Sequence, residues 1–118
     1  AGLLIGTDTP NPFVLPGYAI HDELAGFAAA GIPVEDVLRV ATVDAARFLG
    51  EEDAFGMVAP GLRADLVLLD RDPIADLDTL RDPAGVMVSG RWHARTDLNS
   101  MLEARAAELA GLEQAIEP

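Results

Sequence analysis

The chain has 118 residues, of which 50% are hydrophobic and 24% charged, and this composition is typical of a folded globular protein. Its 20 acidic residues outnumber 8 basic ones, and the formal net charge of −12 excludes nucleic acid and anionic membrane surfaces as partners. The absence of cysteine and lysine excludes disulfides, thiolate zinc sites, cysteine nucleophiles and Schiff-base lysines.

The first predicted element is an apolar strand at Leu3–Ile5, followed by a loop rich in glycine and proline. A continuous apolar run is typical of a strand that is buried on both faces of a parallel sheet. Such a strand needs parallel neighbours, and the chain begins without an initiator methionine. We therefore expect it to be a piece of a longer protein.

Three helices are predicted between Gly17 and Gly50. The first ends at Gly31, a position where a residue in the left-handed conformation commonly stops a helix. Pro33 opens the second at its first position, and Thr42 is predicted to cap a third, which Gly50 closes. The apolar faces of the first two helices are Ile20, Leu24, Phe27 and Ala28, and then Val34, Val37, Leu38 and Ala41.

Short strands are predicted after an acidic connector at residues 51–53. Gly56–Val58 is a short strand candidate, and Ala64–Asp70 reads as a buried strand because it is apolar throughout its middle. An irregular acidic segment follows, with one helical turn predicted near Ile74–Leu77.

A β-hairpin and a helix complete the predicted elements. Residues 86–88 and 91–93 form the hairpin, with Ser89-Gly90 as its two-residue turn. Thr96 is predicted to cap an amphipathic helix that continues toward the end of the sequence. Its stripe contains Leu98, Met101, Leu102, Arg105, Leu109 and Leu112.

Asp8 is the main candidate for chemistry. It directly follows the apolar strand and so lies at the strand's C-terminal end, where catalytic groups gather in barrels and open parallel sheets. A carboxylate there can bind a metal ion or accept a proton from an activated water. The alternative is an Asp that stabilises a turn by bonding its own neighbouring backbone, and the local sequence by itself favours that alternative.

The other polar residues have structural interpretations. His21 has no second histidine three to five residues away, so we expect it to bond a loop carbonyl at a helix start. Glu23 suits the dipole of the same helix. His93 is interpreted as a packing residue of the hairpin, and Arg63 and Asp65 as a structural ion pair.

Several ordered motifs resemble a known family. They include Gly6-Thr7-Asp8, His21-Asp22-Glu23-Leu24 and the strand motif Pro60-Gly61-Leu62-Arg63-Ala64-Asp65-Leu66-Val67. Their order and spacing, from about Leu3 to Trp92, resemble the C-terminal portion of metal-dependent amidohydrolases of the imidazolonepropionase-like and Xaa-Pro dipeptidase-like branch.

The resemblance implies a fold and an activity. It implies a mixed α/β chain that contains the terminal strand and helices of a (β/α)8 TIM barrel and part of a small β-sandwich. It also implies that Asp8 ligates a divalent metal, expected to be zinc, and takes a proton from the water that attacks a carbon–nitrogen bond of an amide, lactam or peptide-like substrate. The family's other ligands, a His-x-His, a bridging lysine or glutamate and two later histidines, are not in this sequence. We therefore expect the chain alone to be inactive.

The expected organisation has three parts: residues 1–50 with the last barrel strand and its helices, 51–94 with the sandwich strands, and 95–118 with the C-terminal helix. The expected partner is a second copy of the chain or the missing N-terminal portion, and the parent's substrate is a small molecule. No apolar run reaches the roughly 20 residues of a membrane span and no leader is evident, so we expect a cytoplasmic protein.

Two other functions remain open at this point. The chain could be a non-catalytic α+β interaction or oligomerisation module, whose exposed strand edges are covered by self-association. It could also be a regulatory subunit whose partner carries the histidines.

Overall fold

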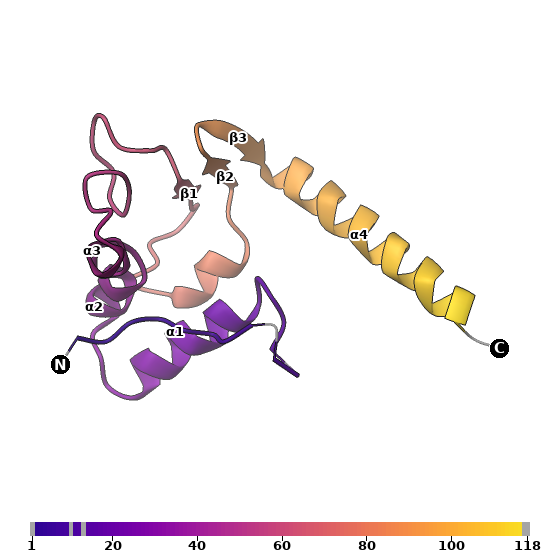
Figure 1. The fold of residues 1–118 in the computed structure, drawn as a ribbon, viewed down its shortest axis with the longest axis horizontal. Coiled ribbons are helices and arrows are strands. Elements are labelled where there is room, and N and C mark those ends of the chain that lie inside the picture. Colours follow the sequence, from indigo (N-terminus) through magenta and orange to yellow (C-terminus); the bar gives the residue numbers. More distant parts are fainter. Residues whose placement is uncertain (1, 10, 13, 117–118) are drawn as a thin grey trace.

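The structure is a computed structural model that describes residues 2–9, 11–12 and 14–116, with side chains as far as residue 111. Its helices and its small sheet confirm the predicted mixed α/β class (Figure 1). In chain order the elements are α1 (Ala19–Ala29), α2 (Val34–Arg39), the π-helical turn η1 (Val40–Asp44), α3 (Ala45–Leu49), β1 (Leu66–Leu68), the 3₁₀ helix η2 (Leu77–Arg81), β2 (Gly85–Val88), β3 (Arg91–Ala94) and α4 (Arg95–Ile116).

The core lies within the helical part of the chain. α1 contacts both α2 and η2, and its apolar spacing places Leu24 in the buried interior as predicted. Gly31 and Gly50 have φ of 91° and 71°, and they follow the ends of α1 and α3 as the sequence predicts. Among the described side chains, the buried apolar residues are Leu24, Val37, Val40 and Ala46.

The sheet is antiparallel, with the strand order β1-β2-β3. β2 and β3 form the predicted hairpin, and Val88 pairs with Arg91 across the turn. Ser89 and Gly90 have φ of 49° and 80°, which is the left-handed pair that a two-residue hairpin turn requires.

The strand predicted at Ala64–Asp70 is shorter and less buried than expected. β1 covers Leu66–Leu68 alone, and the exposed fractions of Val67 and Leu68 are both 55%. β1 pairs with β2 on one side, and within the described residues its other edge is open. The continuous apolar pattern predicted that other residues would pack on both faces of this strand. The described residues leave much of it exposed.

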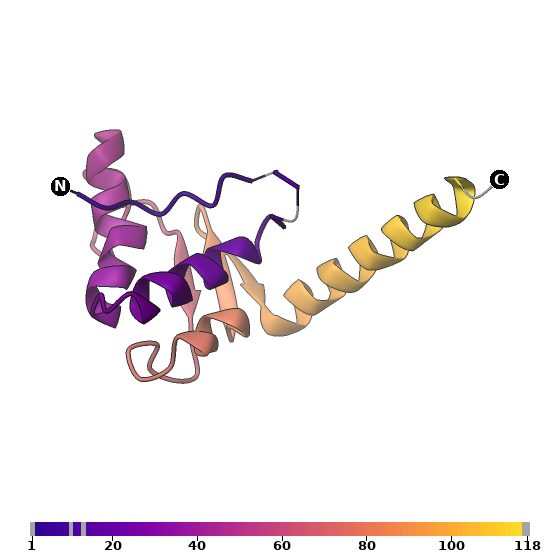
Figure 2. The ribbon, with the colours of Figure 1, turned by 90° about the horizontal axis from the view of Figure 1, so that it is seen from below.

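The N-terminal strand prediction is not confirmed. Residues 2–8 are extended but belong to no sheet, and Leu3 has an exposed fraction of 52%. They run alongside α1, as Figures 1 and 2 both show. A parallel strand forms only when neighbouring strands satisfy its backbone groups, and the described part of the chain offers none here.

The helix boundaries near Thr42 differ from the prediction. Thr42 does not cap a new helix, because α2, η1 and α3 follow one another without a break. Its Oγ1 instead donates to the carbonyl of Leu38 at 2.7 Å, a back-bond typical of Thr inside a helix. Pro33 precedes α2 rather than occupying its first position. Gly56–Val58 forms no strand. The helical turn predicted near Ile74–Leu77 is present as a turn at residues 73–75, where the amide of Asp76 donates to the carbonyl of Asp72 at 3.2 Å, and η2 follows it at Leu77–Arg81.

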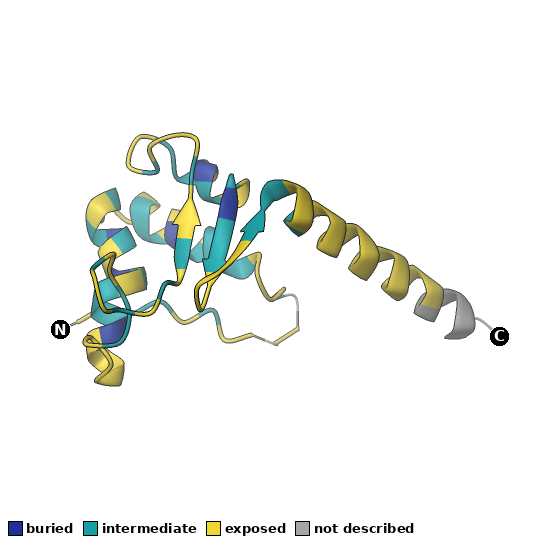
Figure 3. Cartoon of the chain, turned by 90° about the horizontal axis from the view of Figure 1, so that it is seen from above, coloured by how far each residue is buried: buried dark blue, intermediate teal, exposed yellow. Residues whose placement is uncertain are grey.

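Helix α4 leaves the body of the molecule as an exposed arm (Figures 1 and 3). It begins at Arg95. The side chain that bonds the backbone at its start is that of Asp97, and not the predicted Thr96: Asp97 Oδ2 accepts from the amide of Ala94 at 3.1 Å. The side chain of Leu112, which belongs to the predicted stripe, lies outside the described residues. The arm raises the radius of gyration to 16.6 Å, against roughly 13 Å for a compact domain of this length. Of the described helices, none is long and apolar enough to cross a membrane.

Asp65 ties β1 to the hairpin. Its Oδ1 accepts from the amide of Ser89 at 2.7 Å, and its Oδ2 accepts from Arg63 Nε at 2.5 Å, which confirms the predicted ion pair. The hydrogen bond from Ser89, and then that from Arg63, hold the pKa of Asp65 below its ordinary value of 3.8. The carboxylate thus supports the left-handed conformation of a residue other than glycine.

Replacing Asp65 by Ala should lower stability at about pH 7 and have a smaller effect at about pH 3. The folded pKa is depressed, so the stabilisation is present above the ordinary value of 3.8 and is lost as the pH falls through the folded pKa. Urea unfolding of wild type and Asp65→Ala at both pH values measures this, with Glu52→Ala in the exposed connector as the control. An equal loss at both pH values would show that the charge of Asp65 is not involved.

Replacing Gly56 by Ala should destabilise the chain by about 1–3 kcal/mol. A Cβ at Gly56 would lie 2.7 Å from the Ala46 Cβ and 3.2 Å from the Thr42 carbonyl oxygen, and φ is 106°. The matched control is Gly26→Ala in α1, where the new Cβ meets open space and should stabilise by about 0.5–1 kcal/mol. Urea unfolding compares the two variants, and an unchanged midpoint for Gly56→Ala would contradict this packing.

Candidate functional site

Asp8 lies in a tight turn at the end of the extended N-terminal segment. Its φ is 53°, and the amide of Asn11 donates to its carbonyl oxygen at 3.2 Å. Its Oδ2 accepts from Asn11 Nδ2 at 2.6 Å, and the residue is exposed. Asp8 therefore takes part in a turn, as the local sequence favours, but its carboxylate bonds the Asn11 side chain and not the neighbouring backbone. Within the described residues, its other carboxylate oxygen has no hydrogen-bond partner.

Glu23 connects this segment to α1. Its Oε1 accepts from the backbone amide of Gly6 at 2.8 Å, two residues before Asp8. Its Oε2 is buried and has no hydrogen-bond partner within the described residues. The sequence suggested only a helix-dipole role for Glu23. The motif His21-Asp22-Glu23-Leu24 was the available signal, but it does not reveal which backbone group the carboxylate holds.

His21 and Asp22 belong to a charged cluster between α1 and η2. Asp22 Oδ1 accepts from Arg81 Nη2 at 2.8 Å, and Arg81 Nε also donates to Asp78 at 3.2 Å. The Nδ1 atom of His21 is buried without a partner in the described part of the chain, so it does not make the predicted bond to a loop carbonyl. Burial first, and then the nearby guanidinium of Arg81, lower the pKa of His21 from its ordinary value of 6.5, and Asp22 and Asp78 oppose this.

The histidines and Asp8 do not form a metal site. Within the described residues, no three His, Asp or Glu side chains gather into a group that could hold a metal ion. His93 lies on β3, where its backbone pairs with Val86. A catalytic zinc site uses three protein ligands and an open position, so the residues of this chain alone do not fit a complete metal centre.

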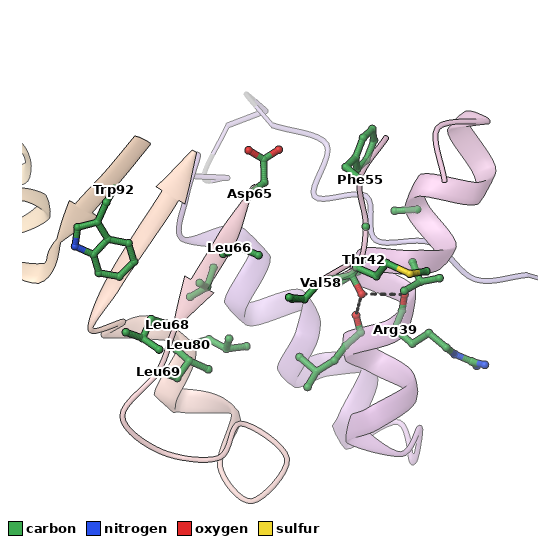
Figure 4. A pocket seen from close by; sticks show the side chains of 17 residues that line it. Arg39, Thr42, Phe55, Val58, Asp65, Leu66, Leu68, Leu69, Leu80 and Trp92 are labelled. Atoms are coloured by element: carbon green, nitrogen blue, oxygen red, sulfur yellow. Dashed lines mark hydrogen bonds between the residues drawn. The ribbon is translucent and has the colours of Figure 1, made fainter. Parts of the chain in front are cut away.

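A large apolar groove lies between the helices and the sheet, and the sequence did not predict it. Its volume is about 890 Å³. Figure 4 shows Phe55 and Val58 on one side and Leu66, Leu68 and Trp92 on the other. Val58 has an exposed fraction of 86%. The apolar run at Ala64–Asp70 contributes to this groove. The sequence predicted that the run would be fully buried, and so it did not indicate a groove.

The family is decided by comparison with known proteins. Residues 4–93 match the amidohydrolase family. The chain belongs to the amidohydrolase family. This confirms the resemblance drawn from the motifs between Leu3 and Trp92. Helix α4 lies beyond the matched residues.

Curated relatives of this amidohydrolase chain are deaminases. It is 42% identical over 69 residues to an adenine deaminase of Sinorhizobium fredii, a match that covers 58% of this chain and 12% of that protein. It is 30% identical over 74 residues to a 5-methylthioadenosine/S-adenosylhomocysteine deaminase of Teredinibacter turnerae, covering 63% of this chain and 16% of the relative.

Solved structures with a similar fold include dipeptidases. A candidate prolidase from Bifidobacterium longum is similar with a TM-score of 0.64 and 32% identity, covering 76% of this chain and 24% of that one. A Xaa-Pro dipeptidase with methionine bound in its active site is similar with a TM-score of 0.59 and 27% identity, covering 63% and 18%. The chain therefore spans less than a quarter of the length of these relatives.

The stability of this amidohydrolase chain should fall as the pH drops through the range just below 6.5, and His21 should be responsible. Because the folded pKa of His21 is depressed, the unfolded chain binds more protons in that range, and acidification favours unfolding. Urea unfolding at about pH 7.5 and about pH 5.5 should show a decline that His21→Gln reduces and His93→Gln retains. An undiminished decline in His21→Gln would contradict the assignment.

Proposed function

We propose that this chain is the C-terminal portion of an amidohydrolase that hydrolyses carbon–nitrogen bonds, and that Asp8 supplies one carboxylate to its active site. The observation that carries the proposal is the family match over residues 4–93, which includes the extended segment that ends at Asp8. The names of the relatives, adenine deaminase and Xaa-Pro dipeptidase, describe reactions at carbon–nitrogen bonds.

The position of Asp8 supports its role. It is exposed at the end of an extended segment, and only one of its carboxylate oxygens is engaged by Asn11 in the hydrogen bond described above. If the extended segment became a barrel strand in the complete protein, Asp8 would lie at the strand's C-terminal end, where the catalytic residues of such barrels are found. We propose that its free oxygen binds a divalent metal and accepts the proton of the attacking water.

The metal centre would need ligands from outside these 118 residues. We propose zinc, because a set of imidazole and carboxylate ligands with an open position is typical of catalytic zinc. When bound, such a metal supplies Lewis acidity that makes water nucleophilic near neutral pH and polarises the bond to be cleaved. What this chain contributes is a positioned carboxylate.

The open surfaces of the chain support a composite structure. We propose that residues 1–50 complete a barrel, residues 51–94 complete a β-sandwich and residues 95–118 form an appended helix. The apolar groove and the open edge of β1 would be covered by the N-terminal portion of the same parent protein, since the chain spans only 12–24% of the four relatives described above. Burying such surface provides the driving force for assembly.

The substrate proposed for the parent is a small molecule with an amide-like or amidine-like carbon–nitrogen bond. The deaminase relatives act, by their names, on adenine and on adenine-containing molecules, and the dipeptidases act on Xaa-Pro peptides. Both bonds are cleaved by adding water at a carbon attached to nitrogen. The substrate-binding residues would lie mostly outside this chain.

A non-catalytic module is the second candidate function for the isolated chain. The bond between Asn11 and Asp8 closes a self-contained turn, and no metal-binding group forms among the described residues. In that case the groove would be covered by a second copy of the chain. Sedimentation of the isolated chain distinguishes the two, since a stable, well-ordered dimer favours the module.

In the assembled parent enzyme, Asp8→Asn should lower kcat by about 10²–10⁴-fold, the contribution typical of a general base. The isolated 118-residue chain should show no turnover and no stoichiometric metal binding. Steady-state kinetics with a purine or Xaa-Pro substrate and metal analysis measure both, with Asp53→Asn in the exposed connector as the matched control.

Two results would contradict the proposal. Turnover by the isolated chain that Asp8→Asn abolishes would show that the chain is a complete catalyst. Full activity of the assembled enzyme with Asp8→Asn would remove Asp8 from the active site.

A further inference from the structure

We propose that Glu23 is a positioning residue that fixes the Asp8 loop against α1 through the backbone amide of Gly6. The structural part of this inference concerns one hydrogen bond. Its consequence for catalysis rests on the proposed function of Asp8.

The bond joins two elements that are otherwise weakly connected. Glu23 Oε1 accepts from Gly6 N at 2.8 Å across 17 positions of sequence. Among the described residues it is the only hydrogen bond that connects residues 2–9 to another secondary-structure element. Figures 1 and 2 show the N-terminal segment lying along α1. The path of the chain into Asp8 therefore depends on this contact.

The geometry of α1 makes Glu23 suited to this role. Leu24 anchors the helix in the core, and Asp22 turns toward Arg81 at 2.8 Å on η2. Glu23, between them in sequence, points toward the N-terminal segment instead. Three consecutive side chains thus attach one helix to three different parts of the chain, and a fixed helix can hold Gly6 in place.

One of the two carboxylate oxygens of Glu23 is shielded from solvent. Its Oε2 is buried and has no partner within the described residues, which is costly for a charged oxygen. A residue that served only the helix dipole would keep both oxygens in water. A hydrogen bond from an amide to a carboxylate is roughly twice as strong as one between neutral groups, which favours the contact of Glu23 Oε1 with Gly6.

Gly6 lies two residues before Asp8, with only Thr7 between them. Loss of the Glu23 contact would free the loop to move relative to α1. A displacement of about 1 Å of a catalytic group can reduce a rate about a hundredfold. Glu23 would therefore act through Asp8 without touching the substrate.

Amide hydrogen exchange of the 118-residue chain tests the structural claim without any catalysis. In Glu23→Ala the Gly6 amide should exchange about tenfold faster or more, while the amides of Leu24 and Val37 keep their protection. Glu23→Gln should restore part of the protection, because its side-chain oxygen can accept the same bond. Glu35→Ala, an exposed residue of α2, is the matched control and should leave Gly6 unchanged. The inference is overturned if the Gly6 amide is unprotected in the wild type or if its exchange rate is unchanged in Glu23→Ala. It is also overturned if the Leu24 amide loses as much protection as the Gly6 amide in that variant.

Kinetics of the assembled enzyme test the consequence. Glu23→Ala should lower kcat about tenfold to a hundredfold with KM changed less than about twofold, and Glu23→Gln should recover much of the loss. An unchanged kcat in Glu23→Ala, in an enzyme that Asp8→Asn inactivates, overturns the positioning role alone. If Asp8→Asn is fully active, the proposed function fails, while the exchange result at Gly6 still decides whether the contact exists.

Discussion

Among the described residues, the buried apolar side chains lie in the helices, while much of the remaining apolar surface is exposed. Leu24 and Val37 are buried in the helical core, whereas Val58 and Val67 are exposed beside a groove of about 890 Å³. Exposed apolar surface of this extent is typical of binding faces, in keeping with the composite structure proposed above. Residues 2–8 form no strand, because no neighbouring strand among the described residues pairs with their backbone.

Local features of the fold could be predicted because their causes are local. The period of Ile20 and Leu24 predicted α1, since apolar residues at three- and four-residue steps form one helix face. Gly50 predicted the end of α3, and Ser89-Gly90 predicted the hairpin turn, because few residues accept a positive φ. The family, too, could be predicted, because it depends on an ordered set of short motifs that the match over residues 4–93 reproduces.

Features that depend on distant contacts could not be predicted. The pattern at Ala64–Asp70 indicated burial, but burial depends on which surfaces are present to pack against it. Thr42 is of a residue type that commonly caps helices, yet its hydroxyl donates to the carbonyl of Leu38 within a continuous helix. At the candidate site, Asp8 could be singled out from its place after an apolar run. The partner of Glu23 could not, because a bond across 17 residues leaves no local signal.

The most direct test of the proposed role of Asp8 is the structure of the complete parent enzyme with its divalent metal bound. The proposal predicts that the N-terminal segment pairs as a barrel strand and that a carboxylate oxygen of Asp8 lies at about 2.0–2.2 Å from the metal, together with imidazoles from outside these 118 residues. A parent structure in which Asp8 stays in its turn with Asn11, facing solvent and remote from any metal, would contradict it.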